Sequence, residues 1–299
     1  MGWINGKTKI CGIFGYPVEH SFSPAMHNAA FKNLSLNRAY VPFPVRPENL
    51  AYAVEAMRTL GLAGVNVTVP HKQAVTEFLD ELSPAARLSG AVNTIVNEGG
   101  VLTGHNTDGE GFIRALAESA GSEYIRGPVL IIGAGGAARA VAVALALSGT
   151  EEIIIANRTE ARAAELSSLL EESTGCSVMA FKWEGQPAEG SPEHREWAAV
   201  LDRVKLLVQT TSLGMRPAVD TYPSIPYQLV HSGQVAVDLV YNPPSTCFMN
   251  KCREAGAVVY NGTGMLLYQG AIAFELWTGR EAPVDIMRRA LEDSISRRG

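Results

Sequence analysis

The chain has 299 residues, of which 46% are hydrophobic and 18% are charged, and its formal net charge is −5 at pH 7. This composition is typical of a folded globular protein and excludes a disordered chain, while the length is enough for two domains. The charges are scattered without long runs of one sign, so neither a nucleic-acid-binding surface nor a basic membrane-binding patch is expected.

The cysteines indicate a reducing compartment, so we expect a cytoplasmic protein with free thiols. They occupy positions 11, 176, 247 and 252 and form no CxxC pair. His20, His71 and His105 also lack an obvious metal-ligand spacing, and no metal site is expected. Asn5, Lys7 and Lys9 stand where a signal peptide would need an apolar core, so export is not expected. The apolar run from Ala140 to Leu147 is too short to cross a bilayer.

The first half of the chain alternates between predicted strands and helices, which is typical of an α/β layer. The expected strands cover residues 10–16, 39–45, 64–70, 92–97 and 101–106, the last two as a hairpin. Helices are expected to begin at Pro24, with Ser23 as N-cap, at Pro47 and at Asp108. A further helix should follow Lys72 and end near Leu79.

The second half alternates again, in the manner of a doubly wound parallel sheet. The expected strands cover residues 129–132, 153–156, 178–182, 205–210, 235–240 and 257–260. Helices are expected over 263–279 and 283–298. We interpret residues 185–197 as a surface insertion, because the segment from Gly185 to Glu193 is rich in Pro, Gly and Glu.

A glycine turn follows the apolar run Val129–Ile132 and precedes an Ala-rich segment that is typical of a helix. Gly133, Gly135 and Ala138 match the dinucleotide-binding fingerprint, which accepts Ala at its third position. Gly133 permits the tight turn, and Gly135 has no Cβ to hold a pyrophosphate away from the backbone. The amides that open the following helix favour that anion.

The next predicted strand ends in Asn157, Arg158 and Thr159, with Arg162 one turn later. An NAD-selective site usually carries an acidic residue here for the ribose 2′-OH. A carboxylate would repel a 2′-phosphate, whereas Arg can bind it with paired, charge-assisted hydrogen bonds. The sequence therefore favours NADP. The alternative is that both arginines lie on a solvated helix face with Thr159 as N-cap.

Polar side chains gather in the first half where apolar ones are expected. Asn66 and Thr68 share one face of a predicted strand, and Lys72 follows its carboxyl end, where open α/β sheets bind ligands. Asp108 could steady the ammonium of Lys72. Ser21, Ser23, Asn93 and Thr94 complete a set of groups suited to a small polyhydroxylated acid. Each alone has a structural explanation, such as an N-cap role for Ser23 or Asp108, but together they favour a substrate site.

We therefore predict a two-lobed α/β protein with an N-terminal α/β substrate domain and a Rossmann-like doubly wound parallel sheet. The first domain should cover residues 1–110, with the C-terminal helix 280–299 packing back on it. The second should cover residues 111–279.

Across nearly its whole length the sequence resembles the shikimate dehydrogenases. In the first half the matching motifs are Ser21-Phe22-Ser23-Pro24, Asn66 to Lys72, Gly90 to Thr94 and Asn106 to Gly109. In the second half they are Gly133 to Ala137, Asn157 to Thr159, Thr211 to Met215, Asp238 to Pro243 and Gly264 to Gln269. Their number and order make the match specific, unlike the glycine turn alone.

The resemblance implies reversible, NADP-linked interconversion of 3-dehydroshikimate and shikimate in aromatic amino-acid biosynthesis, in a cleft between the lobes. It makes Lys72 and Asp108 the acid/base pair. The substrate residues that it implies, besides these two, are Ser21, Ser23, Asn66, Thr68, Asn93, Tyr241 and Gln269. The cofactor residues that it implies are Gly133, Ala134, Gly135, Gly136, Ala137, Asn157, Arg158, Thr159, Arg162, Thr211, Ser212, Met215, Val240, Gly262 and Met265. His20, His71 and His105 are interpreted as packing or loop residues.

Three alternatives remain open. A quinate/shikimate dehydrogenase would often take NAD, which Asn157-Arg158-Thr159 disfavours. A non-catalytic NADP-binding regulator would have lost the acid/base pair, which is present here. A methylenetetrahydrofolate dehydrogenase-like enzyme would leave the Ser21 and Ser23 motif unexplained. The chain is expected to be a monomer or a homodimer.

Overall fold

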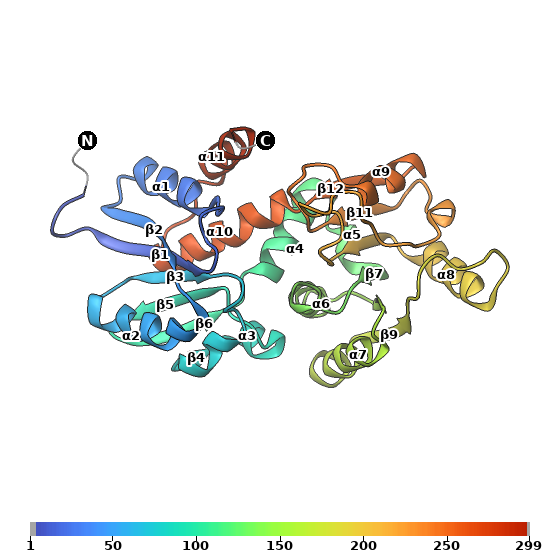
Figure 1. The fold of residues 1–299 in the computed structure, drawn as a ribbon, viewed down its shortest axis with the longest axis horizontal. Coiled ribbons are helices and arrows are strands. Elements are labelled where there is room, and N and C mark those ends of the chain that lie inside the picture. The colour runs from blue at the N-terminus through green and yellow to red at the C-terminus, as the bar shows by residue number, and fades with distance from the viewer. Residues whose placement is uncertain (1–3, 298–299) are drawn as a thin grey trace. The chain divides into compact units, whose positions relative to one another are not determined.

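The computed structural model describes residues 4–297 of the chain. It divides into two compact units (Figure 1). Unit 1 holds the residues up to Gly111 and those from Leu266 onward, and unit 2 is Phe112–Met265. The chain passes from one unit to the other within two helices, α4 (Asp108–Ser119) and α10 (Thr263–Thr278). Each unit contains one six-stranded sheet.

The sheet of unit 1 has the strand order β2-β1-β3-β5-β6-β4. Its strands are β1 (Lys9–Gly15), β2 (Arg38–Pro44), β3 (Gly64–Val67), β4 (Glu81–Leu82), β5 (Thr94–Glu98) and β6 (Val101–His105). β1, β2 and β3 are parallel, whereas β5 and β6 form the predicted antiparallel hairpin. The two-residue β4 pairs with β6 and places the hairpin inside the sheet, not at its edge.

Helices cover both faces of this sheet. One face carries α1 (Ser23–Asn33), the part of α10 from Leu266 on and α11 (Val284–Ser296), and α11 packs on α1 (Figure 1). The other face carries α2 (Leu50–Leu60), η1 (Pro47–Asn49), η2 (Ala74–Phe78) and α3 (Pro84–Ser89). The alternation of β3 assigns Val65 and Val67 to the core beneath α2, so Asn66 points to the opposite face.

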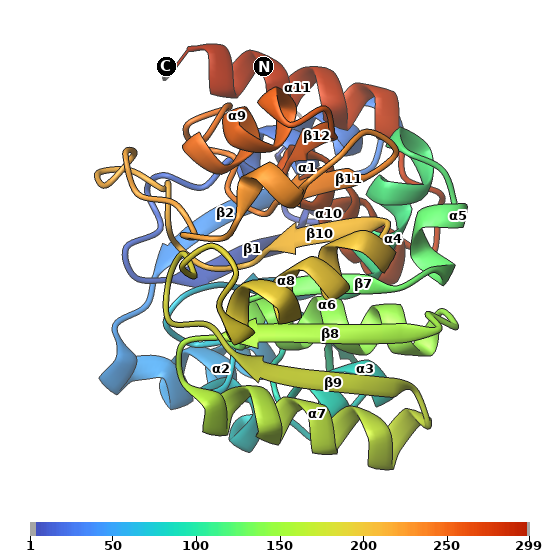
Figure 2. The same cartoon turned by 90° about the vertical axis from the view of Figure 1, so that its right-hand side faces the viewer.

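The sheet of unit 2 is entirely parallel, with the order β12-β11-β10-β7-β8-β9. Figure 2 shows β10, β7, β8 and β9 side by side in that order. Its strands are β7 (Val129–Ile132), β8 (Glu152–Asn157), β9 (Ser177–Lys182), β10 (Leu206–Gln209), β11 (Val235–Asp238) and β12 (Val258–Asn261). The chain order reverses between β7 and β10. Ligands of such sheets bind beyond the carboxyl ends of the strands at this switch point.

The core of unit 2 explains why its strands are unbroken apolar runs in the sequence. Leu130, Ile132, Ile154 and Ala156 face a cluster formed with α8 (Pro192–Arg203) and α9 (Cys247–Glu254). α6 (Gly136–Leu147) and α7 (Glu160–Thr174) pack on each other, and the short α5 (Glu123–Arg126) precedes β7. A strand buried on both faces needs apolar residues at every position, which removes the alternation seen in half-exposed strands.

Several sequence-based expectations are wrong in detail. The predicted 185–197 surface insertion is only partly a loop, because α8 begins at Pro192 and buries Trp197 against Phe181. β3 ends at Val67, before Pro70, which has no amide hydrogen to extend the ladder. The helix expected after Lys72 is only the 3₁₀ turn η2. Ser23 is the first residue of α1 and not its N-cap. Within residues 4–297 no helix is long and apolar enough to cross a membrane.

Candidate functional site

The centre of the candidate site in unit 1 is an ion pair between Lys72 and Asp108. Lys72 Nζ lies 2.5 Å from Asp108 Oδ2, and the two side chains are 33% and 13% exposed. Lys72 lies in the segment between β3 and η2, and its carbonyl accepts a hydrogen bond from the amide of Val92 at 2.7 Å. The main chain of Lys72 is therefore fixed by one hydrogen bond and its ammonium by the ion pair, while one third of the side chain stays accessible.

Asp108 is the first residue of α4, and Asn106 orders the turn that leads into this helix. The side-chain oxygen of Asn106 accepts a hydrogen bond from the amide of Asp108 at 3.1 Å, and the Asn106 amide group donates to Ser89 Oγ and Ala91 O. The carboxylate of Asp108 stands in the first turn of α4, where the helix dipole favours negative charge. The N-cap role considered for Asp108 is wrong, because Asp108 is the first residue of α4.

Asn93 connects the Lys72–Asp108 ion pair to the rest of the site. Its buried side-chain nitrogen donates to Asp108 Oδ1 at 2.9 Å and to Thr107 Oγ1 at 2.9 Å, and lies 3.4 Å from Gln269 Oε1. Its side-chain oxygen accepts from the amide of Thr107 at 2.7 Å. The Thr107 hydroxyl in turn donates to the carbonyl of Gln269 at 3.1 Å. The network fixes both the carboxylate and the start of α4.

Asn66 extends this network to the α1 face of the sheet. Its amide nitrogen donates to Thr94 Oγ1 at 3.0 Å, and its oxygen accepts from the Tyr40 hydroxyl at 2.7 Å. The buried Ser23 side chain also hydrogen-bonds the phenol of Tyr40, whose pKa burial raises well above its usual value. These partners place Asn66 and Ser23 within one chain of polar contacts that begins at Asp108.

Thr68 and Ser21 occupy the segments that follow β3 and β1. The Thr68 amide donates to Phe14 O at 2.9 Å, and a Cβ on Gly15 would lie 2.4 Å from Thr68 Cγ2. Gly15 is therefore required for the position of the Thr68 side chain. Ser21 Oγ accepts from the Ser23 amide at 3.2 Å and orders the turn into α1. Ser21 and Thr68 are both half-buried, so their hydroxyls are partly accessible.

The histidines beside these motifs have structural surroundings. His71 is 1% exposed, and its Nε2 lies 2.7 Å from Val45 O, which ties the Lys72 segment to the end of β2. Burial lowers the pKa of His105, and Glu98 offsets part of this effect. His20 is exposed. In the part of the chain that the structure describes, no group of three His, Cys, Asp or Glu side chains is placed to hold a metal ion.

The glycine turn of unit 2 has the geometry that a dinucleotide requires. Gly133 has φ +114°, and a Cβ there would lie 2.6 Å from Thr210 Oγ1. Gly135 is the N-cap of α6 without a side-chain cap hydrogen bond, and a Cβ at Gly135 or Gly136 would contact no other residue. The exposed backbone of Gly135 to Ala137 therefore presents the positive end of α6 to an anion.

Arg158 and Arg162 supply positive charge beyond the end of β8. Both side chains are exposed, and neither has an ion pair or side-chain hydrogen bond within residues 4–297. Asn157 Nδ2 donates to Thr159 O at 2.8 Å and shapes the turn between them, while the Thr159 side chain makes no cap hydrogen bond. Two guanidinium groups without an anionic partner fit a phosphate better than they fit a neutral ribose.

The remaining predicted cofactor residues follow β10, β11 and β12 in unit 2. Thr211 and Ser212 lie in the loop after β10, and Met215 is 48% exposed in the same loop. Val240 is buried after β11, and a Cβ on Gly262 would lie within 3 Å of Leu239 main-chain atoms. Met265 is half-buried in the first turn of α10. Tyr241, predicted to bind substrate, also lies after β11, and burial raises the pKa of its phenol.

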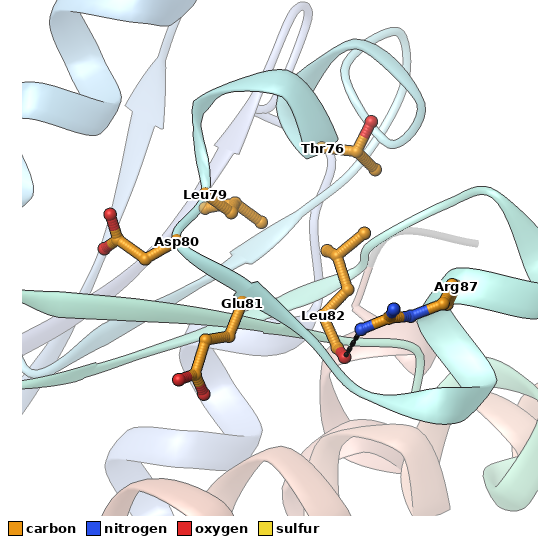
Figure 3. A pocket seen from close by; sticks show the side chains of 6 residues that line it. All are labelled: Thr76, Leu79, Asp80, Glu81, Leu82 and Arg87. Carbon is orange, nitrogen blue, oxygen red and sulfur yellow. Dashed lines mark hydrogen bonds between the residues drawn. The ribbon is translucent and has the colours of Figure 1, made fainter.

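Unit 1 also has a surface pocket that is lined by none of the predicted site residues. It measures about 540 Å³ and is lined by Thr76, Leu79, Asp80, Glu81, Leu82 and Arg87 (Figure 3). Two of its charged side chains are engaged in the fold, since Asp80 pairs with Arg58 at 2.9 Å and Arg87 donates to the carbonyl of Leu82. The unit 1 network is therefore the better candidate site.

Sequence reasoning missed three members of the network: Tyr40, Asn106 and Thr107. Tyr40 has the pattern of an ordinary aromatic residue of a strand, and only the position of Asn66 opposite it reveals its partner. Asn106 and Thr107 belong to the motif Asn106 to Gly109, but their bonds to Ser89 and Asn93 depend on the tertiary fold.

Known families match three segments of the chain. The shikimate dehydrogenase substrate-binding domain matches residues 13–95, the shikimate/quinate 5-dehydrogenase family matches 115–181, and the shikimate 5′-dehydrogenase C-terminal domain matches 262–292.

Whole proteins match over almost the full length. The shikimate dehydrogenase (NADP(+)) of Desulforamulus reducens is 53% identical over 98% of both chains. The shikimate 5-dehydrogenase of Listeria monocytogenes, solved with shikimate and NAD, has a TM-score of 0.89 at 38% identity, over 96% of this chain and 97% of that one. The Thermus thermophilus enzyme, solved with NADP(H) and shikimate, has a TM-score of 0.81 at 36% identity, over 96% of this chain and 99% of that one. These matches show that the chain belongs to the shikimate dehydrogenase family.

Proposed function

We propose that the protein is an NADP-dependent shikimate dehydrogenase, which reduces 3-dehydroshikimate reversibly to shikimate in aromatic amino-acid biosynthesis. The observation that carries this proposal is the Lys72–Asp108 ion pair, held at 2.5 Å by surrounding amides and hydroxyls. Together these groups offer one proton donor, one carboxylate and several neutral hydrogen-bonding groups, which match a ketone beside hydroxyls.

The residues of unit 2 fit NADP. The uncapped start of α6 would hold the pyrophosphate, and Arg158 and Arg162 would hold the 2′-phosphate. When bound, the reduced cofactor supplies the hydride for the ketone carbon. The relative from Desulforamulus reducens is named for NADP(+), whereas the Listeria monocytogenes structure contains NAD, so the arginines are the specific support for NADP.

Lys72 supplies the proton. Its ammonium donates a hydrogen bond to the substrate ketone oxygen, and this bond strengthens as negative charge develops on that oxygen. The ammonium then transfers its proton to the oxygen and forms the hydroxyl. In the oxidative direction neutral Lys72 accepts the hydroxyl proton. A positioned acid or base contributes about 10²–10⁴ in rate.

Asp108 orients Lys72 and stabilises its charged form. Asn93 holds the second oxygen of Asp108, so the carboxylate cannot turn away from the ammonium. The half-buried Ser21 and Thr68, with Ser23, Asn66 and Gln269, are proposed to bind the substrate's carboxylate and hydroxyls. Tyr241, which follows β11, is also proposed to bind the substrate.

The test crosses shikimate and quinate with NADP+ and NAD+ in an assay of absorbance at the reduced-nicotinamide band. We expect the highest kcat/KM with shikimate and NADP+. Quinate with NAD+ as the preferred pair would replace the proposal with a quinate dehydrogenase. No turnover with any pair would support a non-catalytic NADP-binding regulator instead. We also propose a reducing, cytoplasmic location, in which the four unpaired cysteines remain thiols.

A further inference from the structure

A buried carboxyl group ends β11 in unit 2 and has no role in the proposed chemistry. Asp238 is 0% exposed and is neighboured in the sheet by Gln209, which ends β10 and is also 0% exposed. Polar side chains are absent from the rest of both strands, which otherwise contain only Val, Leu and Ala. Two polar residues side by side at the carboxyl edge of the sheet require a specific explanation.

The carboxyl group of Asp238 binds three different parts of unit 2. Its Oδ1 accepts hydrogen bonds from the Val240 amide at 3.0 Å and from Gln209 Nε2 at 3.2 Å. Its Oδ2 accepts from Thr246 Oγ1 at 2.5 Å. Thr246 is the N-cap of α9 and accepts from the amide of Met249. Asp238 thus links the segment after β11 both to β10 and to the start of α9.

Gln209 carries this link into the loop after β10. Its Oε1 accepts from the Thr211 amide at 2.5 Å, and its Nε2 also donates to Leu213 O at 3.0 Å. Thr211 lies against the glycine turn, since a Cβ on Gly133 would be 3.0 Å from Thr211 Cγ2. The two loops are also joined directly, because the Arg216 amide donates to Asn242 O at 3.4 Å.

We propose that Asp238 is a positioning residue for the cofactor, which acts through Gln209, Thr246 and the Val240 amide to hold the loops after β10 and β11 in their cofactor-binding conformation. The inference rests on the proposed function, because those loops carry Thr211, Ser212, Met215 and Val240. Asp238 itself does not touch the cofactor, since it is fully buried behind them.

The charge state of Asp238 gives this role a measurable signature. Burial raises the pKa of its carboxyl to about 6. The titratable groups that face it are Tyr227 from η3 (Tyr227–Leu229) and Cys252 from α9. Burial raises the pKa of Cys252 to about 12 and raises that of Tyr227 as well, so both stay neutral below pH 8. The ionised carboxylate accepts all three hydrogen bonds, whereas the protonated form must turn one acceptor into a donor.

The experiment measures NADP+ binding to the whole protein by calorimetry at pH 7.5 and pH 5.5, for wild type, Asp238→Asn and Asp238→Ala. We expect the wild-type Kd to rise as pH falls through about 6. Asp238→Asn should raise Kd at pH 7.5 on the order of 10-fold, as for a lost hydrogen bond to a charged group. It should also reduce the pH dependence to the part that protonation of the 2′-phosphate, with a pKa of about 6, causes in every variant. Asp238→Ala should weaken binding further, while KM for shikimate should change less than about twofold in Asp238→Asn.

Gln234→Ala is the matched control. Gln234 is buried in the same unit just before β11, and its Nε2 bonds Leu201 O and Val204 O. It should lower the melting temperature as the Asp238 variants do, but leave Kd for NADP+ unchanged. Equal Kd values for wild type and Asp238→Asn at both pH values would overturn the proposal. So would a Kd increase in Gln234→Ala as large as that in Asp238→Ala, because the effect would then be general destabilisation.

The same titrations distinguish a failure of the proposed function from a failure of the role proposed for Asp238. If the wild type binds NAD+ and not NADP+, the NADP preference is wrong, and the same variants titrated with NAD+ still decide the role of Asp238. If the wild type binds neither cofactor, both proposals are overturned.

Discussion

Lys72 and Asp108 stand 36 positions apart in the chain, yet Lys72 Nζ lies 2.5 Å from Asp108 Oδ2. Asn93 holds the other carboxylate oxygen at 2.9 Å, so removal of the ammonium should leave the carboxylate in place. We predict that Lys72→Met lowers kcat by about 10²–10⁴ with little change in KM for shikimate, because the proton donor is lost and the neutral substrate contacts remain.

Lys182→Met is the control for this substitution. Lys182 is 49% exposed and pairs with Glu184 in unit 2, so its loss should leave both kinetic constants unchanged. Steady-state kinetics with saturating NADP+ give kcat and KM for shikimate in both variants and test whether Lys72 acts in catalysis. A Lys72→Met enzyme with near-wild-type kcat would remove Lys72 from the chemistry.

The close approach of Gly15 to Thr68 gives a second prediction. A Cβ at residue 15 would lie 2.4 Å from Thr68 Cγ2, so Gly15→Ala must displace the Thr68 side chain. We expect KM for shikimate to rise at least several-fold, because the Thr68 hydroxyl would leave its binding position. Thr68→Ser removes the clashing methyl group and keeps the hydroxyl.

The double variant Gly15→Ala/Thr68→Ser should therefore recover most of the lost affinity, which a double-mutant cycle on KM would measure. Gly6→Ala serves as control, since a Cβ there would contact no residue. Additive effects of Gly15→Ala and Thr68→Ser would contradict the proposed steric cause.

The fold could largely be predicted from local pattern. The strands β7, β8 and β10 are apolar runs without polar alternation, which is typical of strands buried on both faces. Gly61 ends α2 in the left-handed conformation that glycine permits. The errors fall where local pattern is weak. The two-residue β4 depends on pairing with β6, and α8 is hidden within a polar segment whose Trp197 packs on distant Phe181.

The candidate site could be predicted only as a set of residues. Motifs identified Lys72, Asp108 and Asn93, but spacing alone could not show that Asn93 would hold the carboxylate. Tyr40 was missed because its hydroxyl partner, Asn66, comes from a different strand of the same sheet, 26 positions along the chain.

The two exposed arginines after β8 give a prediction on cofactor choice. Arg158 has no anionic partner within residues 4–297, so its loss should cost little stability. We expect Arg158→Ala to lower the ratio of kcat/KM for NADP+ to that for NAD+ on the order of 10–100-fold, the value of a charge-assisted hydrogen bond to the 2′-phosphate.

Arg195→Ala, an exposed position on α8, should leave that ratio unchanged. The ratio is obtained from initial rates with each cofactor at saturating shikimate. If the ratio of kcat/KM for NADP+ to that for NAD+ is unchanged in Arg158→Ala, Arg158 does not bind the 2′-phosphate and is better interpreted as a solvated surface residue.

His27 gives a prediction on acid stability. Its ring is 0% exposed and stacks on the Tyr40 ring with ring centroids 4.4 Å apart. Burial lowers the pKa of His27 to about 3, and Asn66 offsets only part of this. The unfolded chain takes up a proton near pH 6.5, whereas the folded chain does not until about pH 3. The contribution of His27 to stability is therefore complete above pH 6.5 and falls by about 1.4 kcal/mol per pH unit below it.

His27→Phe keeps a ring beside Tyr40 and removes the proton site. Urea unfolding at pH 7 and pH 5 should show that the free energy of unfolding of the wild type falls by about 2 kcal/mol more than that of His27→Phe over this range. Tyr40 and Cys11, whose pKa values burial raises, do not titrate there. The exposed His231, changed to Phe, should keep the wild-type pH dependence. Parallel pH profiles for wild type and His27→Phe would show that His27 is protonated in the folded protein as readily as in the unfolded chain.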